Sequence, residues 1–324
     1  MKKAILFGLA LSIGLLFFSC KKETPNPMTG GGGSSSSIKT FMTDNRTENT
    51  QTFTVSASEY STIKGNQGTV VKFAPNMFMT VNGQAVSGTL DISLLEILDK
   101  SSMISNGVAT ESNDEMIISG GELKLTVSQN GEELKLADAS NGPVVYVPTM
   151  QADPNMNLFE GMEDNNGDVI WTETDSLVID STTGDSLSFS DSSVVWDGNE
   201  YYYFDFDNSD LGWINCDFFW DNPDAKITVN AQATEAKFTY ENTVFYIVYD
   251  NYNSVGQMAD YDNDGVFSQT EIPVNLDITI VAVSEIDGQF HYGELPATTV
   301  DDQVYDVTLL PVTETELQAN IDAL

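Results

Sequence analysis

Short runs in which apolar and polar residues alternate recur along most of the chain, and a period of two is typical of half-buried β-strands. In the first half, the pattern predicts strands over residues 52–57, 69–74, 89–97, 122–128, 133–137 and 144–147. Asn82-Gly83 and Asn130-Gly131 stand between such runs, and Asn-Gly is the strongest short signal for a β-hairpin. Residues 38–150 are therefore predicted to form an antiparallel β-sandwich.

The second half of the chain shows the same period less evenly. Region 151–225 is predicted to be an aromatic-rich β region with strands at 201–206 and 213–220 and an acidic Ser/Asp insert over 172–197. Region 226–324 is predicted to be a β-sandwich with strands at 226–230, 237–240, 244–249, 276–283 and 305–310. It closes with the one convincing helix, because Thr313 and Glu316 form a capping box and Leu317 and Ile321 follow at helical spacing.

The strand predicted at 213–220 carries apolar residues on both faces, since alternate side chains of a strand point to opposite sides. One face holds Ile214, Cys216, Phe218 and Trp220, and the other holds Trp213, Asn215, Asp217 and Phe219. We favour a core strand that is buried on both faces. The alternative is an aromatic platform for a sugar ring.

The first twenty residues have the layout of a secretory signal. Lys2 and Lys3 precede an apolar run over 4–18 that is too short for a stable membrane-spanning helix. The run ends in Ser19-Cys20, which resembles a bacterial lipoprotein signal, although Phe17 stands where Leu is usual. The resemblance implies a signal peptide over 1–19, lipidation (palmitate) of Cys20 as the first mature residue, and a place in the outer membrane. An ordinary cleaved signal and an uncleaved anchor are the alternatives.

Residues 20–37 are predicted to be the lipidated cysteine and a flexible linker. Pro25, Pro27 and the Gly and Ser runs over 30–37 favour a solvated chain without packed structure. Lys21-Lys22-Glu23, directly after the lipid site, resembles the charged export tags of surface lipoproteins in Bacteroidota. This resemblance implies display on the cell surface, with the lipid as the contact to the membrane.

Composition restricts the partners that such a protein can bind. The chain is 41% hydrophobic and has a formal charge of −36, which is typical of a folded acidic protein and not of a disordered one. Residues 136–324 contain 36 Asp and Glu but only two basic residues, Lys226 and Lys237. Such a surface repels phosphate backbones, so nucleic acid is excluded, and cations, basic proteins and neutral glycans remain. Solubility alone is an equally good explanation of the charge.

Cysteine usage gives no disulfide framework. The chain has two cysteines, and if Cys20 carries lipid, Cys216 has no partner within the chain. We therefore expect Cys216 to be a small buried apolar residue and not a nucleophile.

The sharpest candidate for a binding site is the segment 260–271, which matches the twelve-residue calcium-loop pattern at every specified position. Calcium takes six to eight oxygen ligands. The pattern assigns them to the side chains of Asp260, Asp262, Asp264, Ser268 and Glu271 and to the carbonyl of Val266. Helices do not flank the loop, because 244–250 reads as a strand and Pro273 prevents an exit helix. The alternative is an acidic hairpin turn without a metal.

Signatures of catalysis are scarce. The single histidine, His291, lies in a strand-like segment without a neighbouring Cys or His, so it is expected to be a satisfied or exposed residue and not a zinc ligand. No Gly-x-Ser-x-Gly, Walker or dinucleotide-binding motif occurs. We therefore predict a non-catalytic binding or structural module, stabilised by calcium, whose partner is a glycan or another envelope protein. The alternative is a carbohydrate-binding or glycan-processing component that uses a pair of carboxylates.

Several short motifs occur in a fixed order: Gly68-Thr69-Val70-Val71, Pro75-Asn76-Met77-Phe78, Val86-Ser87-Gly88-Thr89-Leu90, Gly120-Gly121-Glu122-Leu123 and Gly212-Trp213-Ile214-Asn215-Cys216-Asp217. Together they resemble a family of uncharacterised Bacteroidota surface lipoproteins, and the last motif is the most specific. Asp264-Gly265-Val266-Phe267 and Ile272-Pro273 resemble a turn of transthyretin-like or carboxypeptidase-regulatory β-sandwiches. The resemblance implies a chain built from β domains, and it brings no established activity. Together with the strand pattern and the capping box, we expect an all-β fold of two to three antiparallel β-sandwich domains with a short C-terminal helix.

Overall fold

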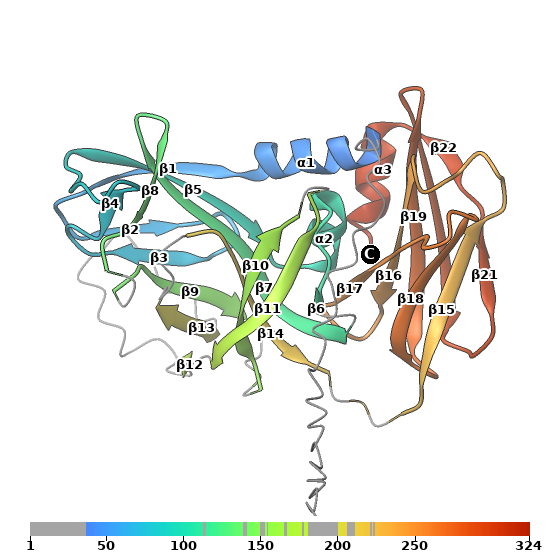
Figure 1. Ribbon diagram of the computed structural model, residues 1–324. Coiled ribbons are helices and arrows are strands. Elements are labelled where there is room, and N and C mark those ends of the chain that lie inside the picture. The colour runs from blue at the N-terminus through green and yellow to red at the C-terminus, as the bar shows by residue number, and fades with distance from the viewer. Residues whose placement is uncertain are drawn as a thin grey trace, which may run out of the picture. The chain divides into compact units, whose positions relative to one another are not determined.

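The computed structural model describes residues 37–112, 115–138, 141–149, 153, 155–164, 167–176, 178–180, 200–205, 211–220, 222 and 224–324. Strands dominate these residues, which confirms the predicted all-β fold class (Figure 1). The predicted signal peptide, Cys20, the linker up to residue 36 and most of the acidic insert lie outside the described residues. No helix in the described ranges combines the length and the apolar composition needed to cross a bilayer.

Within the described residues, the largest sheet has nine strands, and its main path runs in the order β1-β5-β7-β14-β10-β11. Neighbouring strands of this path are antiparallel. The path consists of β1 (Gln51–Ser56), β5 (Thr89–Ile97), β7 (Glu115–Gln129), β14 (Trp213–Phe219), β10 (Asn157–Glu163) and β11 (Val169–Ser176). Three short strands pair beside it, namely β4 (Phe78–Thr80), β6 (Glu111–Ser112) and β8 (Glu132–Leu136).

A second sheet, with five strands in the part of the chain that the structure describes, packs against the first to form a sandwich. Its order is β12 (Val178–Asp180), β13 (Glu200–Asp205), β9 (Val144–Thr149), β3 (Val70–Phe73) and β2 (Ser61–Lys64). Ile92, Leu125 and Val145 point into the shared core, where each is at most 1% exposed. Strands from 151–225 occupy places in both sheets, so the sandwich predicted for 38–150 is completed by β10 to β14.

The C-terminal region forms another sandwich. One sheet has the order β17 (Val255–Met258), β16 (Thr243–Tyr249), β19 (Asp277–Ile286), β20 (Gln289–Thr298) and β22 (Leu310–Val312). The other has the order β18 (Val266–Pro273), β15 (Lys226–Ala233) and β21 (Val304–Val307), and β15 pairs with β21 in parallel. Val229, Phe245 and Ile280 are fully buried between the two sheets.

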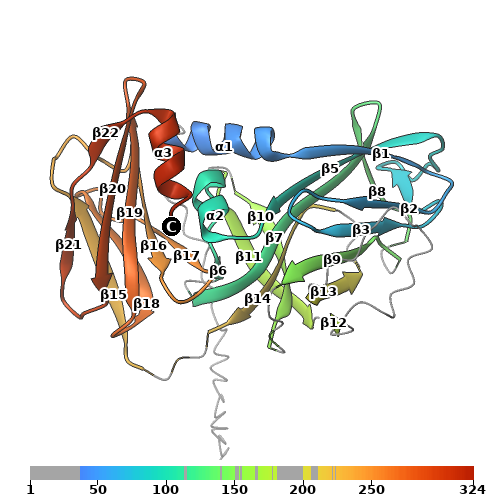
Figure 2. The same ribbon diagram turned by 180° about the vertical axis from the view of Figure 1, so that it is seen from behind.

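Three helices lie next to one another where the two sandwiches meet (Figures 1 and 2), namely α1 (Ser37–Asn49), α2 (Lys100–Asn106) and α3 (Glu314–Ile321). They share one apolar cluster with strands of both sandwiches, which includes Met42, Phe159 and Tyr246. The predicted capping box of α3 is confirmed, because Thr313 Oγ1 accepts the Glu316 N–H at 3.2 Å and the Glu316 carboxylate accepts the Thr313 N–H at 2.8 Å.

Two of these helices are corrections to the expectation that the period is two from residue 38 onward and that only the C-terminus is helical. α1 buries Ile38, Met42 and Arg46 at a spacing of four, so its apolar stripe is too short to stand out in the sequence. The capping box of α2 has Asp99 as N-cap but uses Ser102 where Glu or Gln is usual. Both helices are stabilised by the shared cluster more than by their own patterns.

The turn between β15 and β16 replaces a predicted strand. Residues 237–240 are irregular, and of these four only Phe238 is buried. The backbone N–H of Phe238 donates to the carbonyl of Glu235 at 3.2 Å, and that of Asn242 donates to the carbonyl of Thr239 at 3.0 Å. Alternation over four residues is too short to separate a strand from a turn with one buried side chain.

Candidate functional site

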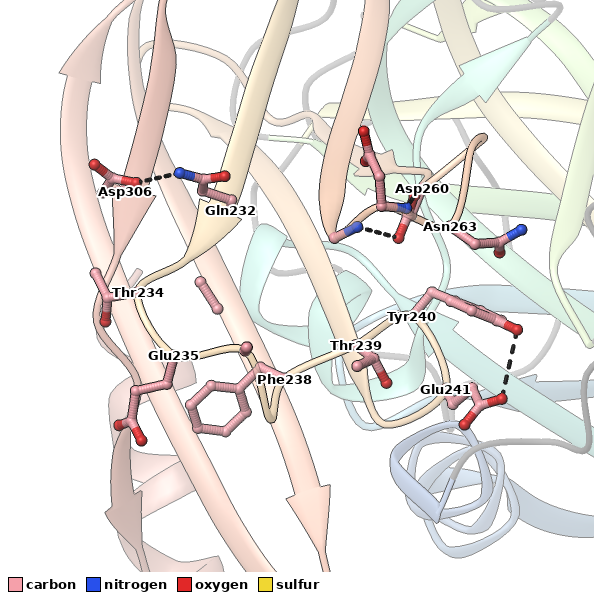
Figure 3. A pocket seen from close by; sticks show the side chains of 14 residues that line it. Gln232, Thr234, Glu235, Phe238, Thr239, Tyr240, Glu241, Asp260, Asn263 and Asp306 are labelled. Atoms are coloured by element: carbon pink, nitrogen blue, oxygen red, sulfur yellow. Dashed lines mark hydrogen bonds between the residues drawn. The ribbon is translucent and has the colours of Figure 1, made fainter.

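The first half of the predicted calcium segment, residues 260–265, lies in the connection between β17 and β18 and curls around one carboxylate (Figure 3). Its second half, residues 266–271, belongs to strand β18 and is therefore not part of a loop. Asp260 accepts the backbone N–H groups of Asp264 at 3.1 Å and of Gly265 at 3.0 Å, and the Asp264 carboxylate accepts the N–H of Val266 at 2.9 Å. Asn263 (φ 55°) and Gly265 (φ 88°) adopt the left-handed backbone that Asn and Gly tolerate best. The structure thus brings the predicted ligands Asp260, Asp264 and Val266 together at one tip.

The other predicted ligands are not gathered around this tip. Asp262 lies in the same bend with an exposed side chain, and the Ser268 hydroxyl donates to Asn230 Oδ1 on β15 at 2.7 Å. Glu271 is exposed and left-handed (φ 58°), because a β-bulge places Thr270 and Glu271 opposite one residue of β15. Within the described residues, no three Asp, Glu, His or Cys side chains lie close enough to hold a metal ion.

The tip forms one wall of a groove with a volume of about 700 Å³ (Figure 3). The other walls are the turn between β15 and β16 and the adjoining parts of β15 and β21. The polar lining consists of Gln232, Thr234, Glu235, Thr239, Tyr240, Glu241, Asp260, Asn263, Asp264 and Asp306. Segments that are far apart in the sequence therefore converge on one hollow of the surface.

The charge of this groove has one sign, because its described lining contains five carboxylates and no basic side chain. Asp306 accepts a hydrogen bond from Gln232 Nε2 at 2.7 Å. Glu235 pairs with Lys237 at 3.2 Å, but the two side chains are 55% and 48% exposed, so solvent screens the pair. An ionised carboxylate offers about four lone-pair sites, and these groups therefore keep capacity to accept hydrogen bonds from a ligand. The groove favours positively charged ligands that donate hydrogen bonds.

Among the described residues of the lining, one aromatic ring is open to a ligand. Tyr240 is 42% exposed, and its hydroxyl donates to Glu241 at 3.4 Å. Phe238 is buried and packs edge-on against His291, with ring centroids 5.1 Å apart. His291 is itself buried, with Nδ1 3.1 Å from the carbonyl oxygen of Gln289. It is therefore a satisfied core residue, which is one of the two outcomes expected from the sequence.

Of the remaining predicted features, Cys20 lies outside the described residues, and Cys216 is a free cysteine that is fully buried, as expected. Strand β14 is buried on both faces, with Ile214 in the core of the first sandwich and Trp213 in the helix cluster. Sequence reasoning missed the groove residues Glu235, Glu241 and Asp306. They come together only through strand pairing and a turn, and the one signal in the sequence is that no Lys or Arg follows Lys237.

No protein-family model, no curated protein and no solved structure matches this chain. The function is therefore inferred from the groove and from the features of the sequence.

Proposed function

We propose that this protein is a lipid-anchored, non-catalytic module of the outer membrane, displayed at the cell surface, whose acidic groove binds a basic segment of another envelope protein. In this proposal the lipid on Cys20 attaches the chain to the membrane. The linker up to residue 36 then separates the folded body from the lipid headgroups, because residue 37 already belongs to α1. The observation that carries the proposal is the groove with five carboxylates and no basic side chain in its described lining.

The energetics of exposed ion pairs set the expected affinity. A single exposed pair contributes about 0.2–1 kcal/mol, so a ligand must engage several carboxylates at once. A segment with several Lys or Arg side chains does this, and Glu235, Glu241 and Asp306 line the groove from two different parts of the chain. We expect a dissociation constant of about micromolar to millimolar for such binding. The affinity should fall steeply as the salt concentration rises, because the charges are exposed.

Calcium at the tip is part of the proposal. Asp260 and Asp264 each use only part of their acceptor capacity on the backbone N–H groups of the curl. An ion bound there would draw in Asp262 and, by a rearrangement of the bulge, Glu271, whose two oxygens would complete the ligand set. The ion would thereby stiffen the wall of the groove that the tip forms.

Tyr240 favours a second candidate, a carbohydrate-binding or glycan-processing component. An exposed aromatic ring next to carboxylates offers a stacking surface together with hydrogen-bond acceptors, and hydrolysis of a glycan needs a pair of carboxylates. Tyr240→Ala separates the two candidates. It should abolish binding of a glycan that stacks on the ring and leave binding of a basic peptide nearly unchanged.

Calorimetric titration with an oligo-arginine peptide, and with a Gly/Ser peptide of the same length, tests the first candidate. We expect salt-sensitive binding of the basic peptide alone. The double variant Glu241→Gln with Asp306→Asn should weaken this binding by about tenfold, which corresponds to about 1.4 kcal/mol for two lost pairs. The matched control is Asp287→Asn with Asp302→Asn, which removes the same charge at two exposed left-handed positions outside the groove. Equal losses in the two double variants would contradict the proposal.

A further inference from the structure

Four polar side chains form a buried cluster on the helix-facing side of the largest sheet. Ser119 and Glu122 lie on β7, and Asn215 and Asp217 lie on β14. Glu122, Asn215 and Asp217 are 0% exposed, and Ser119 is 4% exposed. The neighbours of Asn215 and Glu122 on the adjoining strands are the apolar residues Phe159 and Ile97. Neither the groove nor the predicted calcium segment accounts for these residues.

A β-bulge brings the four side chains to one face. Asn215 lies opposite Glu122 and Asp217 lies opposite Ser119, so Gly120 and Gly121 stand opposite the single residue between Asn215 and Asp217. Residues three apart on a regular strand point to opposite faces, whereas the extra residue of a bulge turns them to the same face. Gly121 permits the bulge because its φ of 137° is unfavourable for any residue with a Cβ. Bulges that redirect side chains in this way are common beside functional sites.

The hydrogen bonds within the cluster leave two carboxylate oxygens without a partner. Asn215 Nδ2 donates to Asp217 Oδ2 at 2.5 Å and lies 3.4 Å from Glu122 Oε1, while the Ser119 hydroxyl donates to Asn215 Oδ1 at 2.9 Å. In the described part of the chain, Glu122 Oε2 and Asp217 Oδ1 accept no hydrogen bond. Arg46, whose charge acts on Glu122, directs its nitrogens to the carbonyls of other residues and to Glu163, and Lys124 also pairs with Glu163.

Among the described residues, neither of the two carboxyls is paired with a cation. Ionised, Glu122 and Asp217 are two fully buried like charges, and burying a charge without a partner is costly. A bound divalent cation removes this cost, since its charge balances two carboxylates and its coordination uses the two oxygens without partners.

We propose that Glu122, Asp217 and Asn215 bind one calcium ion in the interior of the protein. Half a turn of the Asn215 amide would present its oxygen to the ion and its nitrogen to Ser119 Oγ. With both carboxylates bound through two oxygens, the three side chains supply five oxygen ligands, and one enclosed water would complete the six that calcium requires. Oxygen ligands suit a hard cation, and calcium sheds its other waters more readily than magnesium does. Because the site is closed to solvent, the ion would bind as the chain folds and would be retained by the native protein. A glycan cannot reach these carboxylates, so the site is not a hydrolytic pair.

Metal analysis of the purified full chain by mass spectrometry tests this site. After native dialysis against a chelator, which removes ions from the exposed segment 260–271, we expect about one calcium ion per chain, released only on unfolding. Refolding from urea should then give a higher melting temperature with calcium than with chelator. The proposal would be overturned if the natively dialysed protein contained no calcium and its melting temperature after refolding were the same with calcium and with chelator. A protonated carboxyl pair would then be the better explanation of the cluster.

Variants localise the retained ion. The combination of Glu122→Gln and Asp217→Asn should abolish the calcium that survives native dialysis, whereas Asp260→Asn with Asp262→Asn should leave it in place. Retention of the ion by the first combination would place it elsewhere and overturn the assignment. Trp213 and Asn215 are two residues apart on β14, so their side chains lie on the same face, about 7 Å from each other along the strand. Tryptophan-sensitised terbium luminescence after refolding of the wild-type chain therefore gives a readout that needs no variant to fold, and its absence would count against the site.

Discussion

Arg46 offers the most demanding test of how the N-terminal helix is held on the body. The side chain is 8% exposed, and its guanidinium donates to the carbonyls of Asn106 at 2.5 Å, Gly107 at 2.7 Å and Gly167 at 2.8 Å. It also lies 3.4 Å from Glu163. Two of these carbonyls belong to the C-terminal end of α2, where the last C=O groups of a helix have no partner within the helix.

Arg46→Met keeps most of the volume of the side chain and removes its donors. Three carbonyls then lose a charged donor, and each buried acceptor that is left unsatisfied costs about 1–3 kcal/mol. The total is about 3–5 kcal/mol, which is a large part of the 5–15 kcal/mol that holds a typical domain together. We expect a decrease of that size in the free energy of unfolding, measured by urea denaturation followed by circular dichroism. Arg46→Lys should recover only part of the lost stability, because a lysine ammonium is compact and lacks the planar fork of donors with which the guanidinium reaches three separate carbonyls.

Lys39→Gln is the matched control on the same helix. Lys39 pairs with Asp168 at 2.7 Å, but the two side chains are 28% and 34% exposed, so this pair should contribute less than about 1 kcal/mol. If Arg46→Met lost no more stability than Lys39→Gln, the reasoning that α1 is fixed by the buried guanidinium would be refuted.

Three further outcomes follow from single sites. Burial alone would raise the pKa of Glu163, but Lys124 and the Trp213 N–H hold it below its usual value. The stability that these contacts give is therefore present at neutral pH and lost as pH falls through the lowered pKa, and Glu163→Gln should flatten this acid limb in urea titrations at several pH values. Glu271→Gln should lower the number of readily exchanged calcium ions bound per chain by about one in equilibrium dialysis, and an unchanged number would refute calcium binding by residues 260–271. Mass spectrometry of the mature N-terminus should find diacylglycerol on Cys20, and a Cys20→Ala chain that still fractionates with membranes would argue against the anchor.

The sequence predicted those parts of the fold that depend on local pattern. The strand expected over 89–97 coincides with β5, because its alternation is long and its residues suit a half-buried strand. The helix after Thr313 was predicted because both halves of its capping box lie within four residues. Helix α1 was missed, since what holds it is Arg46 and a shared cluster of distant residues.

The candidate sites divide in the same way. The curl around Asp260 agrees with the predicted turn chemistry, because its hydrogen bonds join residues that are close in sequence. The groove and the buried cluster depend on pairings between distant strands, of β15 with β21 and of β7 with β14. The pattern placed Asn215 and Asp217 on one face of a strand, but only the bulge at Gly120 and Gly121 brings Glu122 beside them.

The account depends most on the binding of a basic envelope segment in the acidic groove. The direct measurement is photo-crosslinking on intact cells from a reactive residue placed at Tyr240 in the groove, with the same residue at Tyr60, which is 83% exposed and outside the groove, as control. We predict that Tyr240 alone gives a crosslinked protein, that the attached peptide is rich in Lys and Arg, and that high salt abolishes the product. Identical products from both positions, or attached peptides without basic residues, would contradict the account.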